Sequence, residues 1–164
     1  MNSTVAIRSG APADDDAIWA ILEPTFRAGE TYPIPRDISR ADALAYWHTP
    51  GHTVFVAEDA GTIIGTYYLR ANQRGGGGHV ANCGYMVAPD VSGRGVARAM
   101  CTHSLDAARE RGFTAMQFNF VVASNERAIR LWQGYGFETI GRLARVFHHP
   151  RLGPVDALVM LRAL

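Results

Sequence analysis

Glycine and arginine gather in the segment Ser92–Arg98, which has the sequence SGRGVAR. Gly93 and Gly95 lack a Cβ atom, so their backbone N–H groups can approach a ligand closely. A helix that begins here adds its own free N–H groups, and Arg94 and Arg98 add positive charge at the rim. The pattern predicts a site for a phosphate or pyrophosphate group.

Two common glycine-rich phosphate motifs do not match this segment. A P-loop requires GxxxxGK[ST], which the chain does not contain. A dinucleotide-binding fingerprint requires a third glycine and an acidic residue near the end of the next strand. The chain has neither, because the expected strand end carries Val121-Val122-Ala123. The predicted anion site therefore belongs to another class.

The elements around the segment are those that an anion site at a helix N-terminus needs. Val80–Val87 has the composition of a strand and ends before Pro89, and Ala97–Arg111 has helical periodicity and stops at Gly112. The glycines therefore lie between a strand and the first turn of a helix. This order predicts a strand, turn and helix unit in which the turn binds the anion.

The rest of the chain predicts an α/β protein whose mixed sheet is flanked by helices. Pro24 is expected to bend or end the first helix early, and 27–40 and 75–78 are expected to be loops. The other expected strands are Val5–Arg8, Thr53–Glu58, Thr62–Arg70, Ala115–Val122, Phe137–Phe147 and Val155–Arg162. The other expected helices are the one that follows Asp14, Asp15 and Asp16, then Ser39–Trp47 and Asn125–Tyr135.

Composition narrows the function classes. The 164 residues, 48% of them hydrophobic, suit one domain, 1–164, and the net charge of +1 argues against a dedicated nucleic-acid or membrane-surface binder. Cys83 and Cys101 have no metal-ligand spacing around them, so no metal is expected. Without a leader or an 18-residue apolar run, we expect a cytoplasmic protein.

Two segments resemble the signature blocks of the GCN5-related N-acetyltransferase (GNAT) family. Residues 92–97 are similar to [Q/R]xxGx[G/A], with Ser92 where the family usually has Gln or Arg. Residues 125–137 are similar to NxxAxxxYxxxGF, with Trp132 where Tyr is commonest. Together with the element order, the resemblance covers nearly the whole chain.

The resemblance implies a mostly antiparallel sheet that splays between the strands before and after the loop's helix, and acetyl-CoA as co-substrate. The strand before the loop would pair with the pantetheine arm, the turn would hold the pyrophosphate, and the second block would line the thioester end. The cofactor-binding residues implied are Met86, Val87, Ala88, Ser92, Gly93, Arg94, Gly95, Val96, Ala97, Arg98, Asn125 and Trp132.

Acetyl transfer to an amine requires a neutral amine, a polarised thioester carbonyl and a proton for the leaving thiolate. In the family a Tyr at the position of Trp132 commonly supplies this proton, and an indole is too weak an acid. Tyr135, one helical turn further on, is the candidate acid, with a structural tyrosine as the alternative. Cys83 lacks an assignable His and acid pair, so direct attack is favoured over an acyl-enzyme.

A general base is harder to identify. The strand segment Asn82–Val87 contains no Asp or Glu. Glu30 in the first long loop, His79 before the strand, or an ordered water molecule are the three alternatives.

Two asparagines inside expected strands suggest a polar acceptor site. Asn82 and Asn119 either bridge strands as satisfied core amides or face the cleft and bind an acceptor carboxylate or the thioester carbonyl. Their surroundings, VANCGY and QFNF, resemble the family branch that acetylates imino acids such as azetidine-2-carboxylate. Phe26, Glu30 and Tyr32 either form one wall of the acceptor site or belong to a loop that covers the hydrophobic core.

The sequence therefore predicts an N-acetyltransferase that acts on a small amino or imino acid. Two alternatives stay open: acetylation of a protein or peptide N-terminus, and a CoA-binding module without catalytic activity. Val5–Arg8 and Val155–Arg162 are expected to be edge strands through which a homodimer would pair.

Overall fold

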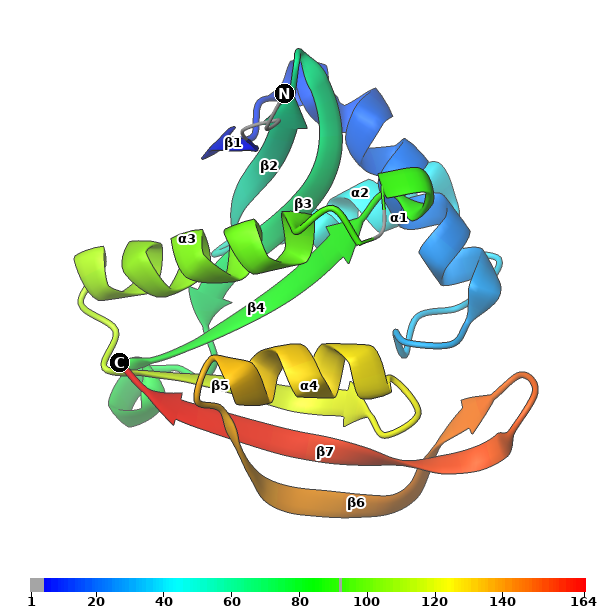
Figure 1. Ribbon diagram of the computed structural model, residues 1–164, viewed down its shortest axis with the longest axis vertical. Coiled ribbons are helices and arrows are strands. Elements are labelled where there is room, and N and C mark those ends of the chain that lie inside the picture. Colours follow the sequence, from blue (N-terminus) through cyan, green and yellow to red (C-terminus); the bar gives the residue numbers. More distant parts are fainter. Residues whose placement is uncertain (1–4, 92) are drawn as a thin grey trace.

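One mixed sheet runs through the part of the chain that the computed structural model describes, residues 5–91 and 93–164 (Figure 1). Its strands are β1 (Ala6–Ser9), β2 (Thr53–Asp59), β3 (Thr62–Ala71), β4 (Val80–Val87), β5 (Ala115–Val122), β6 (Glu138–His149) and β7 (Gly153–Ala163). The α-helices are α1 (Asp15–Ala28), α2 (Arg40–Trp47), α3 (Val96–Glu110) and α4 (Glu126–Gly134). Short 3-10 turns are η1 (Pro12–Asp14), η2 (Gly75–Gly77) and η3 (Pro89–Val91).

The strands lie in the order β1-β2-β3-β4-β5-β7-β6. Neighbours are antiparallel except β4 and β5, which are parallel and pair only over Val80–Ala81 and Ala115–Met116. Beyond these two pairs the strands separate, and a gap opens in the middle of the sheet. The expected α/β class and the splayed, mostly antiparallel sheet are confirmed.

Helices cover both faces of the sheet, because side chains alternate along its central strands. In β3, Tyr67 and Leu69 pack in the cluster that includes Met100 of α3, whereas Tyr68 packs against Trp47 at the end of α2. Figure 1 shows α3 and α4 on the near face and α1 and α2 behind the sheet. The gap between β4 and β5 therefore connects two separately packed sides of the molecule.

The first helix is longer than Pro24 led us to expect. It continues to Ala28 and ends at Gly29, whose φ of 66° lies in the left-handed region. Pro24 removes one backbone donor, but Ile18, Leu22 and Phe26 bury the helix against the sheet with at most 1% of each exposed. Burial on both sides of the proline outweighs the lost hydrogen bond.

One expected edge strand is an interior strand. Val155–Arg162 belongs to β7, which pairs with β5 on one side and β6 on the other. Subunits therefore cannot pair through it, and the two edges of the sheet are β1 and β6. Among the described residues, no helix has both the length and the apolar character needed to cross a membrane.

Candidate active site

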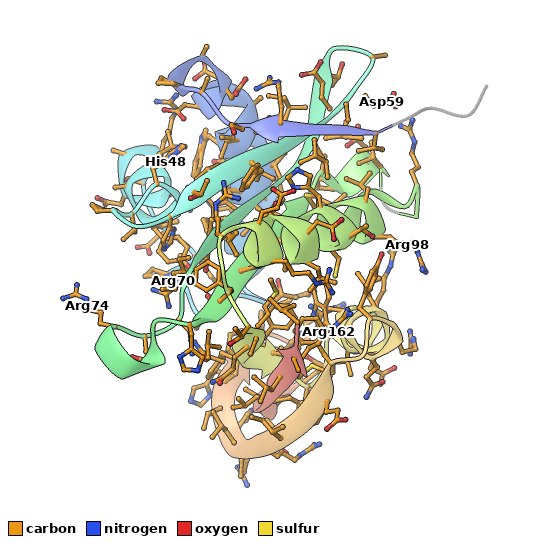
Figure 2. The ribbon with its side chains drawn as sticks, turned by 90° about the vertical axis from the view of Figure 1, so that its left-hand side faces the viewer. His48, Asp59, Arg70, Arg74, Arg98 and Arg162 are labelled. Carbon is orange, nitrogen blue, oxygen red and sulfur yellow. The ribbon has the colours of Figure 1, made fainter. Side chains whose placement is uncertain are left out.

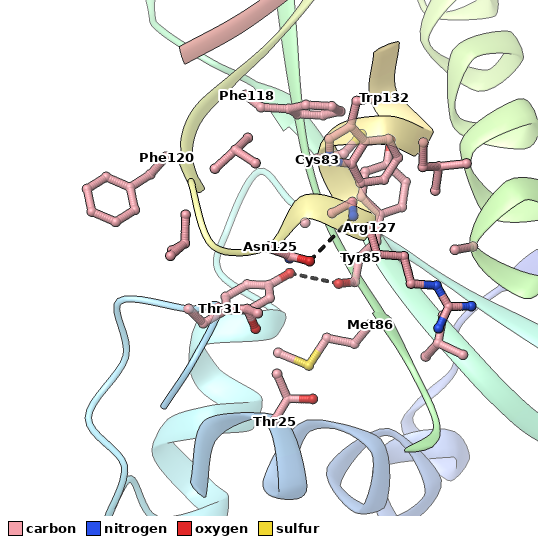
Figure 3. A pocket seen from close by; sticks show the side chains of 18 of the residues that line it. Thr25, Thr31, Cys83, Tyr85, Met86, Phe118, Phe120, Asn125, Arg127 and Trp132 are labelled. Carbon is pink, nitrogen blue, oxygen red and sulfur yellow. Dashed lines mark hydrogen bonds between the residues drawn. The ribbon is translucent and has the colours of Figure 1, made fainter. Parts of the chain in front are cut away.

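A cavity of about 780 Å³ extends through the gap between β4 and β5 (Figure 3). On one side it reaches the turn before α3 and the first half of α4, through Gly93, Gly95 and Arg127. On the other it reaches the end of α1 and the loop after it, through Thr25 and Tyr32. Because it follows the gap, the cavity is lined by residues from both sides of the sheet.

The turn before α3 has the backbone geometry of an anion cradle. Gly93 and Gly95 have φ values of 89° and 80°, which a residue with a Cβ adopts only with strain. The Ala99 N–H donates to the Gly95 carbonyl at 3.0 Å, so the earlier N–H groups of α3 point out of the helix end. An anion placed there meets free donors and the positive end of the helix dipole.

Arginines surround this end of the cavity. Arg98 lies in the first turn of α3, and Arg127 and Arg130 lie in α4, all three in the cavity lining. Figure 3 shows Arg127 beside Tyr85 and Trp132. Arg127 and Arg130 were not among the predicted site residues, although two arginines three residues apart, just after Asn125, are a visible signal for one face of a helix.

Most expected cofactor-binding residues line the cavity, but two do not. Met86, Val87, Gly93, Gly95, Val96, Ala97, Arg98, Asn125 and Trp132 all line it. Arg94 lies outside and pairs with Asp59, Nη2 to Oδ2 2.8 Å. Ala88 also lies outside: its N–H donates to the Ile64 carbonyl at 2.9 Å and its carbonyl accepts from Val91, so its expected pairing with pantetheine is not supported. Ser92 lies outside the residues that the structure describes.

Asn125 and Trp132 are positioned by α4. The Asn125 side chain accepts a hydrogen bond from the Ala128 N–H at 3.4 Å and caps the helix. Trp132 is only 8% exposed, and its ring lies 4.9 Å from that of Tyr85 and 5.0 Å from that of Phe118, between centroids. The aromatic cluster holds α4 beside the gap.

Tyr135, the candidate acid, is not in the cavity lining. Its hydroxyl donates to the Arg98 carbonyl at 2.9 Å and lies 2.8 Å from Thr102 Oγ1. Both partners belong to α3, so the phenol joins the end of α4 to α3. This contact fits the structural alternative for Tyr135.

Tyrosines line the cavity on the α1 and α2 side. Tyr32 donates its hydroxyl to the Tyr85 carbonyl at 2.9 Å, which ties the loop after α1 to β4 (Figure 3). The hydroxyls of Tyr46 and Tyr68 lie 3.4 Å apart. Burial raises the pKa of Tyr32 well above its usual value, so this phenol stays protonated and serves as a hydrogen-bond donor, not as a base.

Gly84 is required for this arrangement. The Tyr68 ring lies so close to β4 that a Cβ at Gly84 would come within 2.6 Å of its nearest ring carbon. The same ring stacks on His52, with centroids 4.1 Å apart. Gly84 therefore lets the Tyr68 ring approach β4, and in this way it shapes the tyrosine-lined part of the cavity.

Both candidate asparagines line the cavity and are hydrogen-bonded. Asn82 donates its amide to the Gln117 carbonyl at 2.9 Å. Asn119 donates to Asn72 Oδ1 at 2.6 Å and accepts from Gln117 Nε2 at 2.9 Å. Asn82 thus bridges β4 and β5, and Asn119 joins β5 to the residue that follows β3. Both amides also face the cavity, and their binding of a substrate stays a prediction.

The candidate bases lie elsewhere. Glu30 pairs with Arg151, Oε1 to Nη2 2.9 Å, and neither it nor the exposed His79 lines the cavity. The lining contains no Asp, Glu or His among the described residues. Cys83 does line it, but burial raises the pKa of its thiol to about 12, so it is a neutral thiol at physiological pH.

The comparisons with known proteins agree with this geometry. The model of the acetyltransferase (GNAT) family matches residues 16–137. The N-acetyltransferase aca1 of Schizosaccharomyces pombe is 27% identical over 129 residues, which are 69% of this chain and 62% of that protein. The chain thus spans less than two thirds of that relative's length.

Solved structures show the same fold. A GCN5-related N-acetyltransferase from Kribbella flavida is 40% identical with a TM-score of 0.93, and the match covers 98% of each chain. The structure of yncA from Salmonella typhimurium with its cofactor acetyl-CoA is 23% identical with a TM-score of 0.85, covering 99% of this chain and 95% of that one. With a family model that matches most of its length, the chain belongs to the GNAT family of N-acetyltransferases.

Proposed function

We propose that this protein transfers the acetyl group of acetyl-CoA to the amine of a small amino or imino acid. One observation carries the proposal: a single cavity joins an anion cradle on the α3 side to a tyrosine-lined chamber on the α1 side. A cofactor and an acceptor that enter from opposite faces meet in the gap between β4 and β5. The arrangement therefore supports direct attack while both are bound.

The cradle fits a CoA pyrophosphate. Gly93 and Gly95 keep the turn free of side chains, and an added Cβ at Gly95 would meet no atom within 4 Å, so this space is open to a ligand. The N–H groups of Val96, Ala97 and Arg98 would hold the phosphates, with Arg127 and Arg130 adding charge. When bound, acetyl-CoA supplies the activated acyl group.

The acceptor amine must lose a proton, and the lining offers no carboxylate or imidazole to take it among the described residues. Tyr32, Tyr46 and Tyr68 provide hydroxyls that orient water or the amine. We therefore infer that the amine reacts in its neutral form and releases its proton to water. Below the pKa of the acceptor amine, kcat/KM should then rise about tenfold per pH unit.

A pair of glycine substitutions tests the cofactor site. Gly95→Asp places bulk and negative charge in the cradle and should abolish CoA binding, measured by calorimetry, and acetyl-CoA turnover. Gly112→Asp is the matched control, because Gly112 has nearly the same φ, 81° against 80°, and lies at the far end of α3. Equal CoA affinity in the two variants would refute the assignment of the turn.

A panel of amines tests the catalytic step. Release of CoA thiol from acetyl-CoA is followed with free amino acids, cyclic imino acids and peptides with a free N-terminus. Turnover of the small acceptors is expected. Tight CoA binding without turnover of any amine would show a CoA-binding module, and turnover of peptides alone would show an N-terminal acetyltransferase.

A further inference from the structure

Arg70 lies at the point where the sheet divides. It pairs in register with Asn82, which follows Ala81, the last residue of β4 that pairs with β5. Arg70 is also part of the cavity lining. Its side chain therefore lies where the gap begins.

Arg70 belongs to the acceptor side of the cavity. Along β3 it shares a face with Tyr68, which packs against Trp47 of α2. Figure 2 shows Arg70 on the α2 side and Arg98 on the opposite, α3 side. The turn that forms the cradle comes after η3, beyond the end of β4 at Val87, and the five residue-to-residue steps from Asn82 to Val87 alone span roughly 17 Å. Arg70 is thus too far from the cradle to contact the same pyrophosphate.

The charge of Arg70 is not neutralised by the residues that the structure describes. Its Nε donates to Asn82 Oδ1 at 3.4 Å, and no carboxylate in the described chain forms an ion pair with it. The cavity lining adds no acid. A half-buried guanidinium in a chamber without a counter-charge favours an anionic ligand.

We propose that the acceptor carries a carboxylate group and that Arg70 binds it, placing the amine toward the gap. This inference rests on the proposed function and adds the residue that recognises the carboxylate of its acceptor. The Nε contact with Asn82 orients the guanidinium and leaves both Nη groups as donors. Two parallel N–H donors match the two oxygens of a carboxylate, which makes such pairs short and directional.

Recognition by Arg70 would disfavour two classes of acceptor, protein N-termini and polyamines. A protein N-terminus has a peptide carbonyl where a free amino acid has its carboxylate, and a polyamine brings further positive charge. Both would leave Arg70 without a counter-charge, and the loss of a charged hydrogen bond weakens recognition.

The test compares each amino or imino acid with its carboxamide, at saturating acetyl-CoA, in wild-type protein and in Arg70→Gln. The wild type should prefer the carboxylate form by at least about tenfold in kcat/KM, since hydrogen bonds to charged groups are strong. In Arg70→Gln this preference should collapse to about one, with KM for carboxylate acceptors raised roughly 10- to 100-fold. Arg70→Lys keeps the charge without the planar fork and should give an intermediate preference.

Arg74→Gln is the matched control, because Arg74 is exposed, follows the same strand and lies outside the cavity lining. It makes the same change in net charge and should keep the wild-type preference. CoA affinity should not change in either variant. The proposal would be overturned if the wild type accepted carboxamides equally well, or if Arg70→Gln lowered kcat/KM for the carboxylate and the carboxamide by the same factor. Either result would leave the proposed acetyltransferase function standing. Absence of turnover with every amine would instead overturn the proposed function, and this inference with it.

Discussion

At the scale of single residues, the site depends on what surrounds each reactive group. Cys83 lies in the cavity lining, yet burial keeps its thiol protonated. Tyr135 lies on the motif that suggested an acid, yet its hydroxyl is bound by α3. Arg70 was not among the site residues predicted from the sequence, yet it lies where the sheet divides and lines the cavity, which suits it to bind an acceptor. Surroundings, more than residue type, decide which group can react.

The variant Tyr135→Phe tests whether Tyr135 has a structural or a catalytic role. We expect the variant to lose about 1 kcal/mol of unfolding free energy, because one hydrogen bond is lost, and to keep its turnover rate. Thr102→Val, which removes a partner of the same phenol, should behave alike. Chemical denaturation and steady-state kinetics measure the two effects. A loss of turnover of about 100-fold or more would instead show that Tyr135 is a general acid.

Gly84→Ala tests the shape of the acceptor chamber. The added methyl group would displace the Tyr68 ring, which is confined by His52 and by Trp47, 5.0 Å away between centroids. Overpacking should cost about 1–3 kcal/mol of stability. The kcat/KM for the acceptor should fall roughly 10- to 100-fold with CoA affinity unchanged. In Gly141→Ala the new Cβ would meet Val159 at an ordinary 3.6 Å, and this control should keep full activity.

At the scale of elements, the N-termini of α3 and α1 differ in what surrounds them. The start of α3 leaves its N–H groups for a ligand, whereas the residue before α1, Asp14, makes its side-chain hydrogen bonds back toward the preceding chain and does not cap the helix. Asp14 accepts from the Ala11 N–H at 2.8 Å and from Arg8 Nη1 and Nη2 at 2.8 and 2.9 Å. This bidentate pair joins β1 to the helix that covers the acceptor chamber.

The Asp14 carboxylate should make stability depend on pH. The hydrogen bonds from Arg8 hold the pKa of Asp14 below its usual value in the folded protein. A lowered folded-state pKa means that this stabilisation is present at neutral pH and is lost as pH falls below about 4. Asp14→Asn should lower the melting temperature by about 2–4 °C at pH 7 and flatten its decline in acid.

Asp16→Asn is the control for this prediction, since the Asp16 side chain is 93% exposed. It should leave both the melting temperature and its acid dependence close to wild type. Equal acid sensitivity in all three proteins, measured by melting scans from pH 3 to 7, would rule out the assigned role of Asp14.

At the scale of the whole molecule, the divided sheet separates two binding sides. Helices α3 and α4 cover the side with the cradle, and α1 and α2 cover the side with the tyrosines and Arg70 (Figures 1 and 2). Each side has its own packed cluster, and the cavity connects them only where β4 and β5 part. In the proposed function, acetyl-CoA and the acceptor bind on these two sides, so both would occupy the protein together.

Simultaneous occupancy predicts the form of the kinetics. Initial rates measured against both substrates should give intersecting lines in double-reciprocal plots, as expected for a ternary complex. Mass spectrometry after incubation with acetyl-CoA alone should detect no acetylated protein, since the Cys83 thiol is neutral. Cys83→Ala should keep its turnover. Parallel lines together with an acetylated Cys83 would establish an acyl-enzyme route instead.

The amino-acid sequence by itself determined the class of fold, the order of strands and helices, and the anion cradle. These features are local: Gly93 and Gly95 adopt their turn, and Asn125 caps α4, through contacts a few residues away along the chain. Single-residue conformations and short periodicities are visible in such segments. The continuation of α1 past Pro24 was predicted wrongly, because packing against the sheet carries the helix through the proline until it ends at Gly29.

Tertiary structure alone decided how distant side chains meet. It placed Arg70 beside Asn82, turned Tyr135 to α3, joined Glu30 to Arg151 and put β7 inside the sheet. The residue contacts among these join positions 12 or more apart, and strand register and helix packing select them. Binding of CoA could thus be inferred from a short motif, whereas the proposed acceptor site depends on where the sheet divides, because that point brings Arg70, Asn82 and Asn119 to one cavity.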